Sequence, residues 1–474
     1  MSTISNPIIP IKQEFYDICT NKIVNWDTNS NNYLDLKALA SFCSLGFMLD
    51  DDTFSKRIKV CKPATDYQLD ENKNINGINK KWEWHYKPTE RSFKNTLNDF
   101  KELFSTIIKT ETINKSILLP ISGGLDSRTL FVPISDRKNV VLASYDFEGG
   151  FHESETGKIL SKQFNIPYYA QKIQRGYLWQ KLDEISHLNN CMTDFNHPRQ
   201  VDAIPHWKGL ADVILLGHWG DVLFDKHTES DKINYDYQLI HLKNNILKSG
   251  GCELADDLWR IWSLEGTFDA YMMERLDKLY SEIDIDHPSA RIRAFKSLYW
   301  APRWTSINLS LFNQVGEIVI PYYSDEMCKF ICTVPERHLA DRKIQIEYVK
   351  KQCHEAARIP WQKYYPLNLY NYQRFNHPHY YLVRAVRKAK RILGQYFSKS
   401  PDLITRNWEL QFLGKQNIFE LKKNLLERKE INKLIPQNLI RKYLDKFQVN
   451  PVKYAHPISM LLTLAVFSDR HYQE

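Results

Sequence analysis

Apolar side chains recur along this chain at two different spacings, and the spacing changes near residue 116. Over residues 90–110 the apolar positions lie three or four residues apart, which is the spacing of one helical face. After residue 116, short β-rich apolar runs take over, at 117–121, 140–145, 168–173 and 213–216. Helical stretches at 152–164 and 177–188 follow the second and third runs. Strands that alternate with helices in this way predict parallel β-α-β units with right-handed crossovers.

The same change of pattern divides the chain into two predicted regions. Residues 1–89 contain short apolar segments broken by Asn- and Asp-rich stretches, such as 27–32 and 70–79, which are typical of strands and turns. Residues 90–474 then hold an α/β core at about 111–232 and a helical remainder. Because 474 residues exceed the size at which a single hydrophobic core stops growing, we expect two regions with separate cores.

Composition adds little to this picture. No apolar run is long enough to span a bilayer, and the first residues lack the features of a secretion signal, so we expect a cytoplasmic protein. The formal net charge of +8 favours anionic partners without identifying one. The 8 cysteines lack the paired spacing of zinc or redox sites, and we expect most to be small buried side chains.

A glycine-rich turn follows the first strand of the predicted α/β core. Its sequence is Ser122-Gly123-Gly124-Leu125-Asp126-Ser127. Glycines let the main chain approach an anion closely, N–H groups at the start of the next helix point at the anion, and serine hydroxyls add donors. A carboxylate would repel phosphate, but it suits Mg²⁺, which bridges phosphates to carboxylates. The turn therefore predicts a phosphate site in which Asp126 is a metal ligand.

The whole six-residue motif resembles the fingerprint of ATP pyrophosphatases that use a PP-loop, and differs from the GxxxxGK[ST] loop of kinases. Within that superfamily the chain resembles asparagine synthetases. The motif matches SGGLDS, and the strand at 140–145, which includes Ser144, is similar together with Glu153 to the family's adenine side. Residues 215–224 resemble the second pyrophosphate loop, SGEGSDEVFGG, and residues 317–324 resemble the EVRVPFLD segment that shapes the acceptor pocket. The resemblance implies an adenine nucleotide alpha hydrolase-like (HUP/PP-loop) parallel-sheet domain that binds ATP and Mg²⁺.

The second loop departs from the family's pattern. Gly217 and Asp221 keep it, and the resemblance makes Asp221 a second magnesium ligand beside Asp126. His218 and Val222 stand where the family carries glutamates, and His218 offers a cationic or hydrogen-bonding contact instead. The family also places a lysine on the α-phosphate after the EVRVPFLD-like segment. The candidates for that catalytic role in this chain are Lys343 and Lys363.

The N-terminal region departs most from the family. Glutamine-using asparagine synthetases expose a cysteine after removal of the first methionine, whereas residue two is Ser2 here and the first cysteine is Cys19. The stretch from Leu39 to Pro63 resembles the far end of the glutaminase domain. We therefore interpret residues 1–89 as a truncated glutaminase-like remnant, with nitrogen supplied by ammonia, an amine substrate or a separate glutaminase.

The resemblance implies an amide ligase that activates a small-molecule, saccharide or peptide carboxylate as an acyl-adenylate. Three alternatives stay open: a degenerate nucleotide-binding scaffold, a peptide macrolactam synthetase, and a PP-loop enzyme that thiolates tRNA. The last would need a reactive cysteine or an RNA-binding domain, and the sequence shows neither, so nucleic acid is not expected as a partner. A basic amphipathic stretch at 381–397 is typical of a surface helix and also suits contact with an acidic membrane surface.

Overall fold

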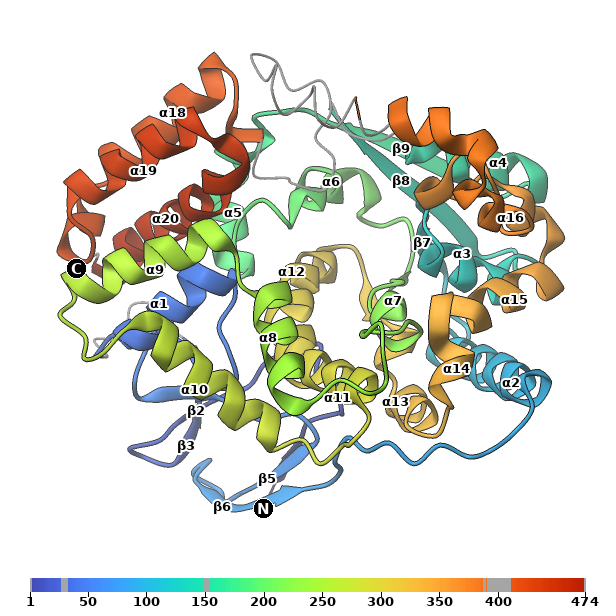
Figure 1. The fold of residues 1–474 in the computed structure, drawn as a ribbon, viewed down its shortest axis with the longest axis horizontal. Coiled ribbons are helices and arrows are strands. Elements are labelled where there is room, and N and C mark those ends of the chain that lie inside the picture. The colour runs from blue at the N-terminus through green and yellow to red at the C-terminus, as the bar shows by residue number, and fades with distance from the viewer. Residues whose placement is uncertain (1, 27–32, 149–152, 387–388, 390–410, 473–474) are drawn as a thin grey trace.

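The computed structural model describes residues 2–26, 33–148, 153–386, 389 and 411–472, and it has an α/β fold around a parallel sheet of five strands (Figure 1). The strand order is β11-β10-β7-β8-β9. The strand bounds are Ile117–Pro120 for β7, Val140–Phe147 for β8, Tyr168–Ile173 for β9, Val213–Leu215 for β10 and Glu317–Val319 for β11. The predicted strands β7 to β10 are confirmed, and β11 adds an edge that the pattern did not predict.

The sheet changes direction of winding at its central strand. Residue Ile117 of β7 pairs with Val140 of β8 on one side and with Val213 of β10 on the other, and all the pairings in this sheet are parallel. The chain therefore moves outward through β8 and β9, returns across β7, and continues through β10 and β11. In open α/β sheets, ligands bind outside the carboxyl ends of the strands at such a switch point.

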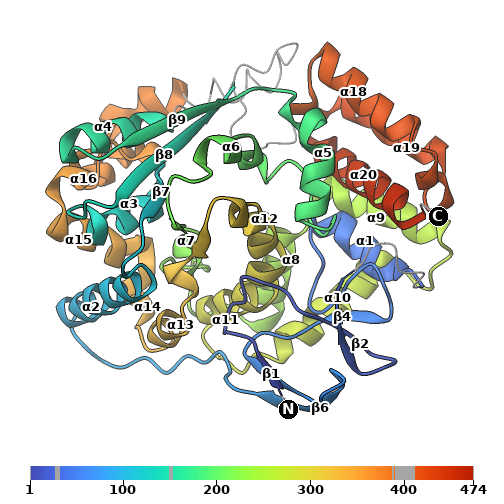
Figure 2. The ribbon, with the colours of Figure 1, turned by 180° about the vertical axis from the view of Figure 1, so that it is seen from behind.

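Helices that were predicted from spacing are present close to their expected bounds. Helix α2 (Phe93–Glu111) starts at Ser92, whose hydroxyl accepts the N–H of Asn95 as an N-cap. Helices α4 (Ser154–Phe164) and α5 (Tyr177–Leu188) follow β8 and β9. Figures 1 and 2 show α2, α4 and α3 (Asp126–Phe131) on the side of the sheet that faces away from the rest of the molecule.

The rest of the chain after residue 232 is largely helical, as predicted. Its longer helices are α8 (Tyr235–Ile246), α9 (Ser249–Ile261), α10 (Phe268–Ser281), α11 (Pro288–Phe295), α15 (Lys343–Gln352), α18 (Lys415–Leu426), α19 (Gln437–Val449) and α20 (Pro451–Tyr472). Shorter helices are α6 (Ile204–Trp207), α7 (Gly220–Leu223), α12 (Ser306–Leu309), α13 (Asp325–Ile331), α14 (Glu336–Leu339) and α16 (His354–Arg358). A π-helix, η3 (Lys296–Thr305), joins α11 to α12.

The N-terminal region forms two small antiparallel sheets beside helix α1 (Leu36–Leu45). One sheet has the order β1-β5-β6, with β1 at Ser2–Ser5, β5 at Thr65–Leu69 and β6 at Ile75–Lys80. The other has the order β3-β2-β4, with β2 at Phe15–Asp17, β3 at Lys22–Val24 and β4 at Ile58–Val60. The short strands expected in this region are therefore present.

Side chains of the N-terminal region share their cores with distant parts of the chain. Phe15, Phe42 and Phe54 belong to one buried cluster with residues of α19 and α20, and the rings of Phe54 and Phe467 stack at 3.8 Å. Ile8 and Phe47 belong to the cluster that also contains the parallel sheet. The apolar contacts thus cross residue 90, and the division into domains at that position stays a prediction.

Two other expectations bear on the molecule's surface. Among the described residues, no helix has both the length and the apolar character needed to cross a membrane. Of the basic stretch at 381–397, residues 381–386 begin as a helix with Tyr381 and Leu382 exposed, while 387–388 and 390–397 lie outside the described residues. Peripheral membrane contact through this stretch stays a prediction.

Candidate functional site

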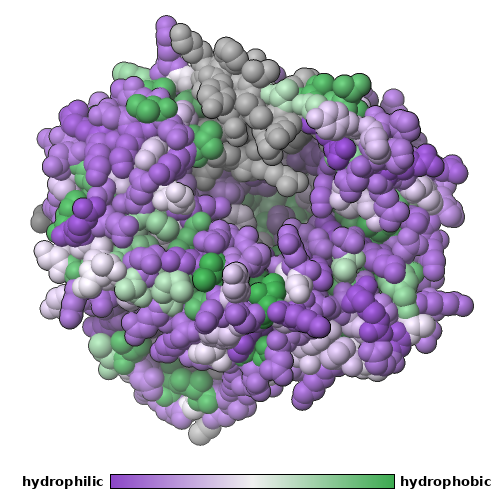
Figure 3. Space-filling view, viewed as in Figure 1, coloured by the Kyte–Doolittle hydropathy of each residue, from purple (hydrophilic) through white to green (hydrophobic). Residues whose placement is uncertain are grey.

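A cavity of about 540 Å³ opens at the carboxyl ends of β7, β8 and β10, which is the switch point of the sheet. Figure 3 shows this face of the molecule hollowed near its centre. Ser144 of β8 lines the cavity together with Ser122 and Gly217, which follow the ends of β7 and β10. The structure therefore brings together, around one cavity, the loops after β7 and β10 and the strand β8, which the sequence places on the adenine side.

The first loop lies between β7 and α3 and is held by its own hydroxyls. The N–H of Ser122 donates to the Ser127 Oγ at 3.1 Å, and the two hydroxyl oxygens lie 3.1 Å apart. The N–H of Gly124 donates to the Ser122 Oγ at 3.2 Å. Ser122, Asp126 and Ser127 line the cavity, whereas Leu125 is buried in the core, where it anchors the loop.

A buried arginine fixes the outer side of this loop. The Arg128 guanidinium donates to the carbonyl oxygens of Ile359 at 2.8 Å and Pro360 at 3.0 Å. Burial lowers the pKa of Arg128 to about 10, so the side chain stays charged at neutral pH. The N–H of Gln362 donates to the Gly123 carbonyl at 3.1 Å, and a Cβ at Gly123 would lie 2.8 Å from the Gln362 Cβ. Glycine is therefore required at position 123 by close packing.

The second loop follows β10 and packs directly on the first. A Cβ at Gly217 would lie 3.0 Å from the backbone nitrogen of Ser127, and a Cβ at Gly220 would overlap the Asp126 carboxylate. Between these glycines, Trp219 adopts a left-handed backbone conformation with φ of 78°. That conformation costs a bulky residue on the order of 1–3 kcal/mol. The Trp219 Nε1 donates to the Ser297 Oγ at 3.1 Å, which ties the second loop to η3.

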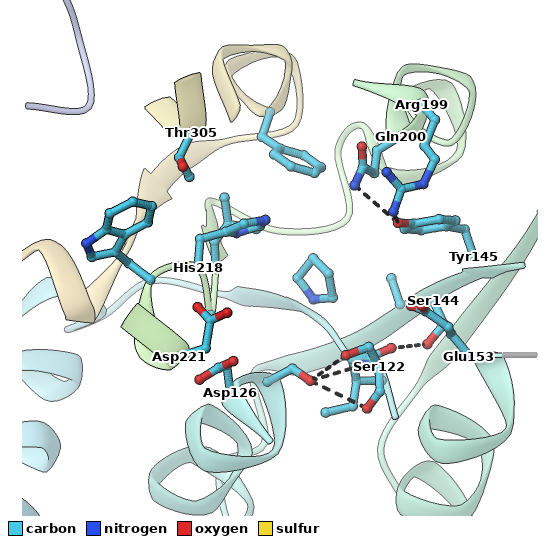
Figure 4. Close-up of a pocket in the computed structure, with 18 of the residues that line it drawn as sticks. Ser122, Asp126, Ser144, Tyr145, Glu153, Arg199, Gln200, His218, Asp221 and Thr305 are labelled. Atoms are coloured by element: carbon cyan, nitrogen blue, oxygen red, sulfur yellow. Dashed lines mark hydrogen bonds between the residues drawn. The ribbon is translucent and has the colours of Figure 1, made fainter. Parts of the chain in front are cut away.

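The tight contact between the loops brings Asp126 and Asp221 together, and Figure 4 shows their carboxylates facing one another. Asp126 Oδ1 also accepts hydrogen bonds from the Arg342 guanidinium and from Gln345 Nε2, the latter at 2.9 Å. Burial raises the pKa of Asp126, and the nearby Asp221 charge adds to this effect, while Arg342 opposes it. Two facing carboxylates of this kind repel each other unless a cation lies between or beside them.

The carboxylate pair fits Mg²⁺ better than an ion held by protein ligands alone. No group of three or more His, Cys, Asp or Glu side chains able to hold a metal occurs in the described ranges. Mg²⁺ is usually bound through one or two carboxylates together with substrate phosphates and water. Asp126 and Asp221 would hold it, and the adjacent loop would present the phosphates.

A third group of side chains lies across the cavity from Asp221 (Figure 4). Ser144, Tyr145 and Glu153 line this side, and the Ser144 hydroxyl donates to the Ile121 carbonyl at 2.6 Å. The Tyr145 hydroxyl accepts hydrogen bonds from Arg199 at 2.7 Å and from Gln200 at 3.2 Å. These residues form the polar wall where the sequence analysis expects adenine.

His218 also lines the cavity, beside Asp221 (Figure 4). Its Nδ1 has no hydrogen-bond partner within the part of the chain that the structure describes. Burial lowers the pKa of His218 to about 4 against the opposing effect of Asp221, so the imidazole is neutral at physiological pH. Of the two contacts considered for His218, the hydrogen-bonding one therefore fits the structure and the cationic one does not.

The two lysines predicted for the α-phosphate are not among the residues that line the cavity. The Lys343 Nζ lies 4.5 Å from the centre of the Phe93 ring, and the Lys363 Nζ lies 5.3 Å from that of Tyr364. The cations beside the carboxylates are instead Arg342, which contacts Asp126, and Lys296, which lines the cavity. Sequence reasoning missed both, because neither stands in a motif and each comes from a helix far along the chain.

Aromatic side chains form the remaining wall. Trp300 and Trp304 of η3 line the cavity together with Trp207 and Phe312. The rings of Trp207 and Phe312 stack with 8° between their planes, and Trp300 stacks on Phe47 of the N-terminal region at 5.6 Å. The N-terminal region therefore supports one wall of the cavity from behind.

No protein-family model matches this chain, and no curated protein matches it. The family resemblance stays a prediction that rests on the motifs and on the geometry described above.

Proposed function

We propose that this protein is an ATP-dependent ligase that activates a carboxylate as an acyl-adenylate and joins it to ammonia or an amine. The observation that carries this proposal is the pair of facing carboxylates, Asp126 and Asp221, beside the Ser122–Ser127 loop at the sheet's switch point. The β11-β10-β7-β8-β9 strand order and the loop after β7 support a PP-loop type of nucleotide domain.

In this proposal the ATP triphosphate lies along the first loop, and the adenine end lies toward Ser144, Tyr145 and Glu153. Mg²⁺, held by the two aspartates, would neutralise phosphate charge. A carboxylate oxygen of the acceptor attacks the α-phosphorus, the bond between the α-phosphorus and the bridging oxygen breaks, and pyrophosphate leaves. Loops that are fixed before the substrate binds reduce the entropic cost of this alignment.

The second half-reaction forms the amide. The amine attacks the acyl carbonyl, AMP leaves with the electron pair of the broken C–O bond, and the ammonium formed loses a proton. The neutral imidazole of His218, beside Asp221, would accept a hydrogen bond from the amine, and the released proton would pass to solvent. Nitrogen would come from ammonia, an amine-bearing substrate or a separate glutaminase.

Pyrophosphate release tests the proposal directly. Purified protein is incubated with ATP, Mg²⁺ and a panel of carboxylates and amines, and pyrophosphate and AMP are measured together. We expect release that depends on the carboxylate and falls at least ~10²-fold in Asp126→Asn and Asp221→Asn, since each removes charge that binds the metal. Asp136→Asn, an exposed aspartate remote from the motif, is the matched control and should retain the rate.

One observation favours a second candidate, the catalytically degenerate scaffold. Arg342 and Gln345 both occupy Oδ1 of Asp126, so a guanidinium stands where a cation would bind. A scaffold would bind ATP with or without Mg²⁺ and would release no pyrophosphate or AMP with any carboxylate. Calorimetric ATP titrations beside the release assay separate the two candidates.

A further inference from the structure

The cavity has two chemically different ends. One end is built from the loops after β7 and β10 and carries hydroxyls, backbone amides and carboxylates. The other includes residues of η3, and Figure 4 places Thr305, the final residue of η3, at the end away from Ser144 and Glu153. The proposed ATP site accounts for the first end and leaves the second for the other substrate.

The π-helix η3 carries a repeated set of side chains along the cavity, beginning with Lys296 on the side of Asp221. Lys296, Trp300 and Trp304 are spaced four residues apart, and all three line the cavity. In a π-helix about 4.4 residues make one turn, so side chains at this spacing lie along one face. A cation and two indole rings therefore follow one another along the same wall.

The aromatic rings are held rigidly. Trp300 and Trp304 meet edge to face, with 88° between their planes, and Trp300 is backed by Phe47. Phe312, which also lines the cavity, stacks on the buried Trp207. Fixed aromatic faces bind flat or ring-shaped groups with an apolar face, because such groups replace water over the rings without leaving polar atoms unpaired.

Lys296 supplies the complementary charge for an anion. Its Nζ lies 3.4 Å from Nδ1 of His227, and burial together with nearby cations keeps that imidazole neutral. Within the described part of the chain, the polar neighbour of this ammonium is thus an uncharged group, and the Asp221 carboxylate acts on it only through its electrostatic field. A partly desolvated ammonium at the edge of a cavity favours a ligand carboxylate.

We infer that the acceptor is a carboxylate borne on a ring, aromatic or saccharide, whose face packs on one of the two indoles, Trp300 or Trp304, and whose edge meets the other, while Lys296 binds the carboxylate. This inference rests on the proposed ligase function for the meaning of acceptor. It excludes aspartate as a preferred acceptor, because aspartate is small and has no ring face, so it would leave the aromatic faces uncovered.

Binding measured by calorimetry tests the inference. Aspartate, glucuronate and 4-hydroxybenzoate are each titrated with and without Mg²⁺ and α,β-methylene ATP, an analogue that cannot release pyrophosphate. We expect at least one ring acid to bind ten-fold or more tightly than aspartate, and whichever binds tells an aromatic source from a saccharide source. Aspartate binding as tightly as both ring acids, or neither ring acid binding, would overturn the inference.

Variants assign the contacts. Lys296→Met should weaken the ring acid at least ten-fold, Lys296→Arg should restore most of the affinity, and Lys278→Met, an exposed lysine of α10, should change nothing. Trp304→Leu should weaken the ring acid more than aspartate. Thermal melting of each variant shows whether it is folded, and unchanged ring-acid affinity in folded Lys296→Met protein would overturn the inference.

The pyrophosphate-release assay tells a failure of the ring-bearing acceptor apart from a failure of the proposed ligase function. Ring-acid binding without pyrophosphate release would end the ligase proposal and leave the binding site standing. Release driven by aspartate and by neither ring acid would support the ligase and reject the ring-bearing acceptor.

Discussion

At the scale of single residues, His218 combines an unusual position with an unusual charge state. It stands in the loop after β10, which we propose binds phosphate and where a cation would help, yet burial keeps its imidazole neutral at physiological pH. A neutral imidazole beside a carboxylate can accept a hydrogen bond but cannot neutralise phosphate charge. The charge state of His218 therefore bears on the proposed reaction, and it also predicts how the stability of the fold depends on pH.

Folding should weaken on acidification because of His218. Its pKa in the folded protein is about 4, below the ordinary value of 6.5, so the unfolded chain takes up a proton at higher pH than the folded protein does. The stability contribution is complete above pH 6.5 and is lost as the pH falls toward 4. Between pH 7 and pH 5 we expect the free energy of unfolding to fall by about 1–2 kcal/mol more in the wild type than in His218→Gln.

Urea unfolding at both pH values, without Mg²⁺ or nucleotide, measures this difference. His206→Gln is the matched control, because His206 is exposed and does not line the cavity. Equal pH dependence of the wild type and His218→Gln would show that position 218 does not hold a neutral buried imidazole.

At the scale of elements, the helices and strands that could be predicted are those that a local sequence pattern determines. Strands β7 to β10 and helices α2, α4 and α5 were predicted close to their bounds, because apolar spacing and turn residues act over a few positions. Strand β11 has only three residues, which is too short to show the alternation of apolar and polar positions that predicts a strand. The sequence indicated this segment only through its resemblance to a family motif. Its strand state depends on pairing with β10, a long-range contact.

The site was predictable only in part, for the same reason. Ser122, Asp126 and Ser127 of the first loop and Gly217 and Asp221 of the second lie in contiguous motifs, and all five line one cavity. Lys296 and Arg342 were missed, since their approach depends on how η3 and α15 pack against the sheet. The left-handed backbone of Trp219 was not predicted either, because tryptophan is a rare choice for such a position.

Phe47, two residues after the end of α1, packs on Trp300 of η3. This contact predicts that a change in the N-terminal region alters the binding of one substrate and not of the other. Phe47 is 2% exposed and stacks on Trp300, so Phe47→Leu should loosen the aromatic wall at a cost of roughly 1–2 kcal/mol in stability. We expect the KM of the carboxylate that drives pyrophosphate release to rise several-fold while the KM of ATP stays within about two-fold.

Phe42→Leu is the matched control for steady-state kinetics. Phe42 is fully buried and meets Phe54 edge to face, away from the cavity, so a similar loss of stability should leave both KM values unchanged. A rise in the ATP KM with Phe47→Leu would contradict a role confined to the acceptor wall.

At the scale of the whole molecule, the shared cores predict cooperative unfolding. Residues of the β3-β2-β4 sheet and of α1 pack with α19 and α20, and the Trp26 ring lies 6.3 Å from the Phe54 ring at this junction. Trp fluorescence and far-UV circular dichroism should therefore give one coincident urea transition. Phe467→Ala should lower the midpoint of both signals together and cost about 3–5 kcal/mol, because it removes a ring stacked on Phe54.

Expression of residues 1–89 alone completes this test. Without α19 and α20 this fragment exposes one face of its apolar core, and we expect no cooperative transition. Two separate transitions in the full chain, or a folded fragment, would instead support an independent N-terminal domain that ends at residue 89.

The stacking of Phe54 on Phe467 also has a consequence for biosynthesis. Phe54 emerges from the ribosome long before Phe467 is made, and at bacterial or eukaryotic elongation rates the interval is on the order of tens of seconds. During that interval the apolar side chains of α1 and its neighbouring strands have no permanent cover. Nascent chains should accordingly depend on chaperones that shield an early segment until translation is nearly complete.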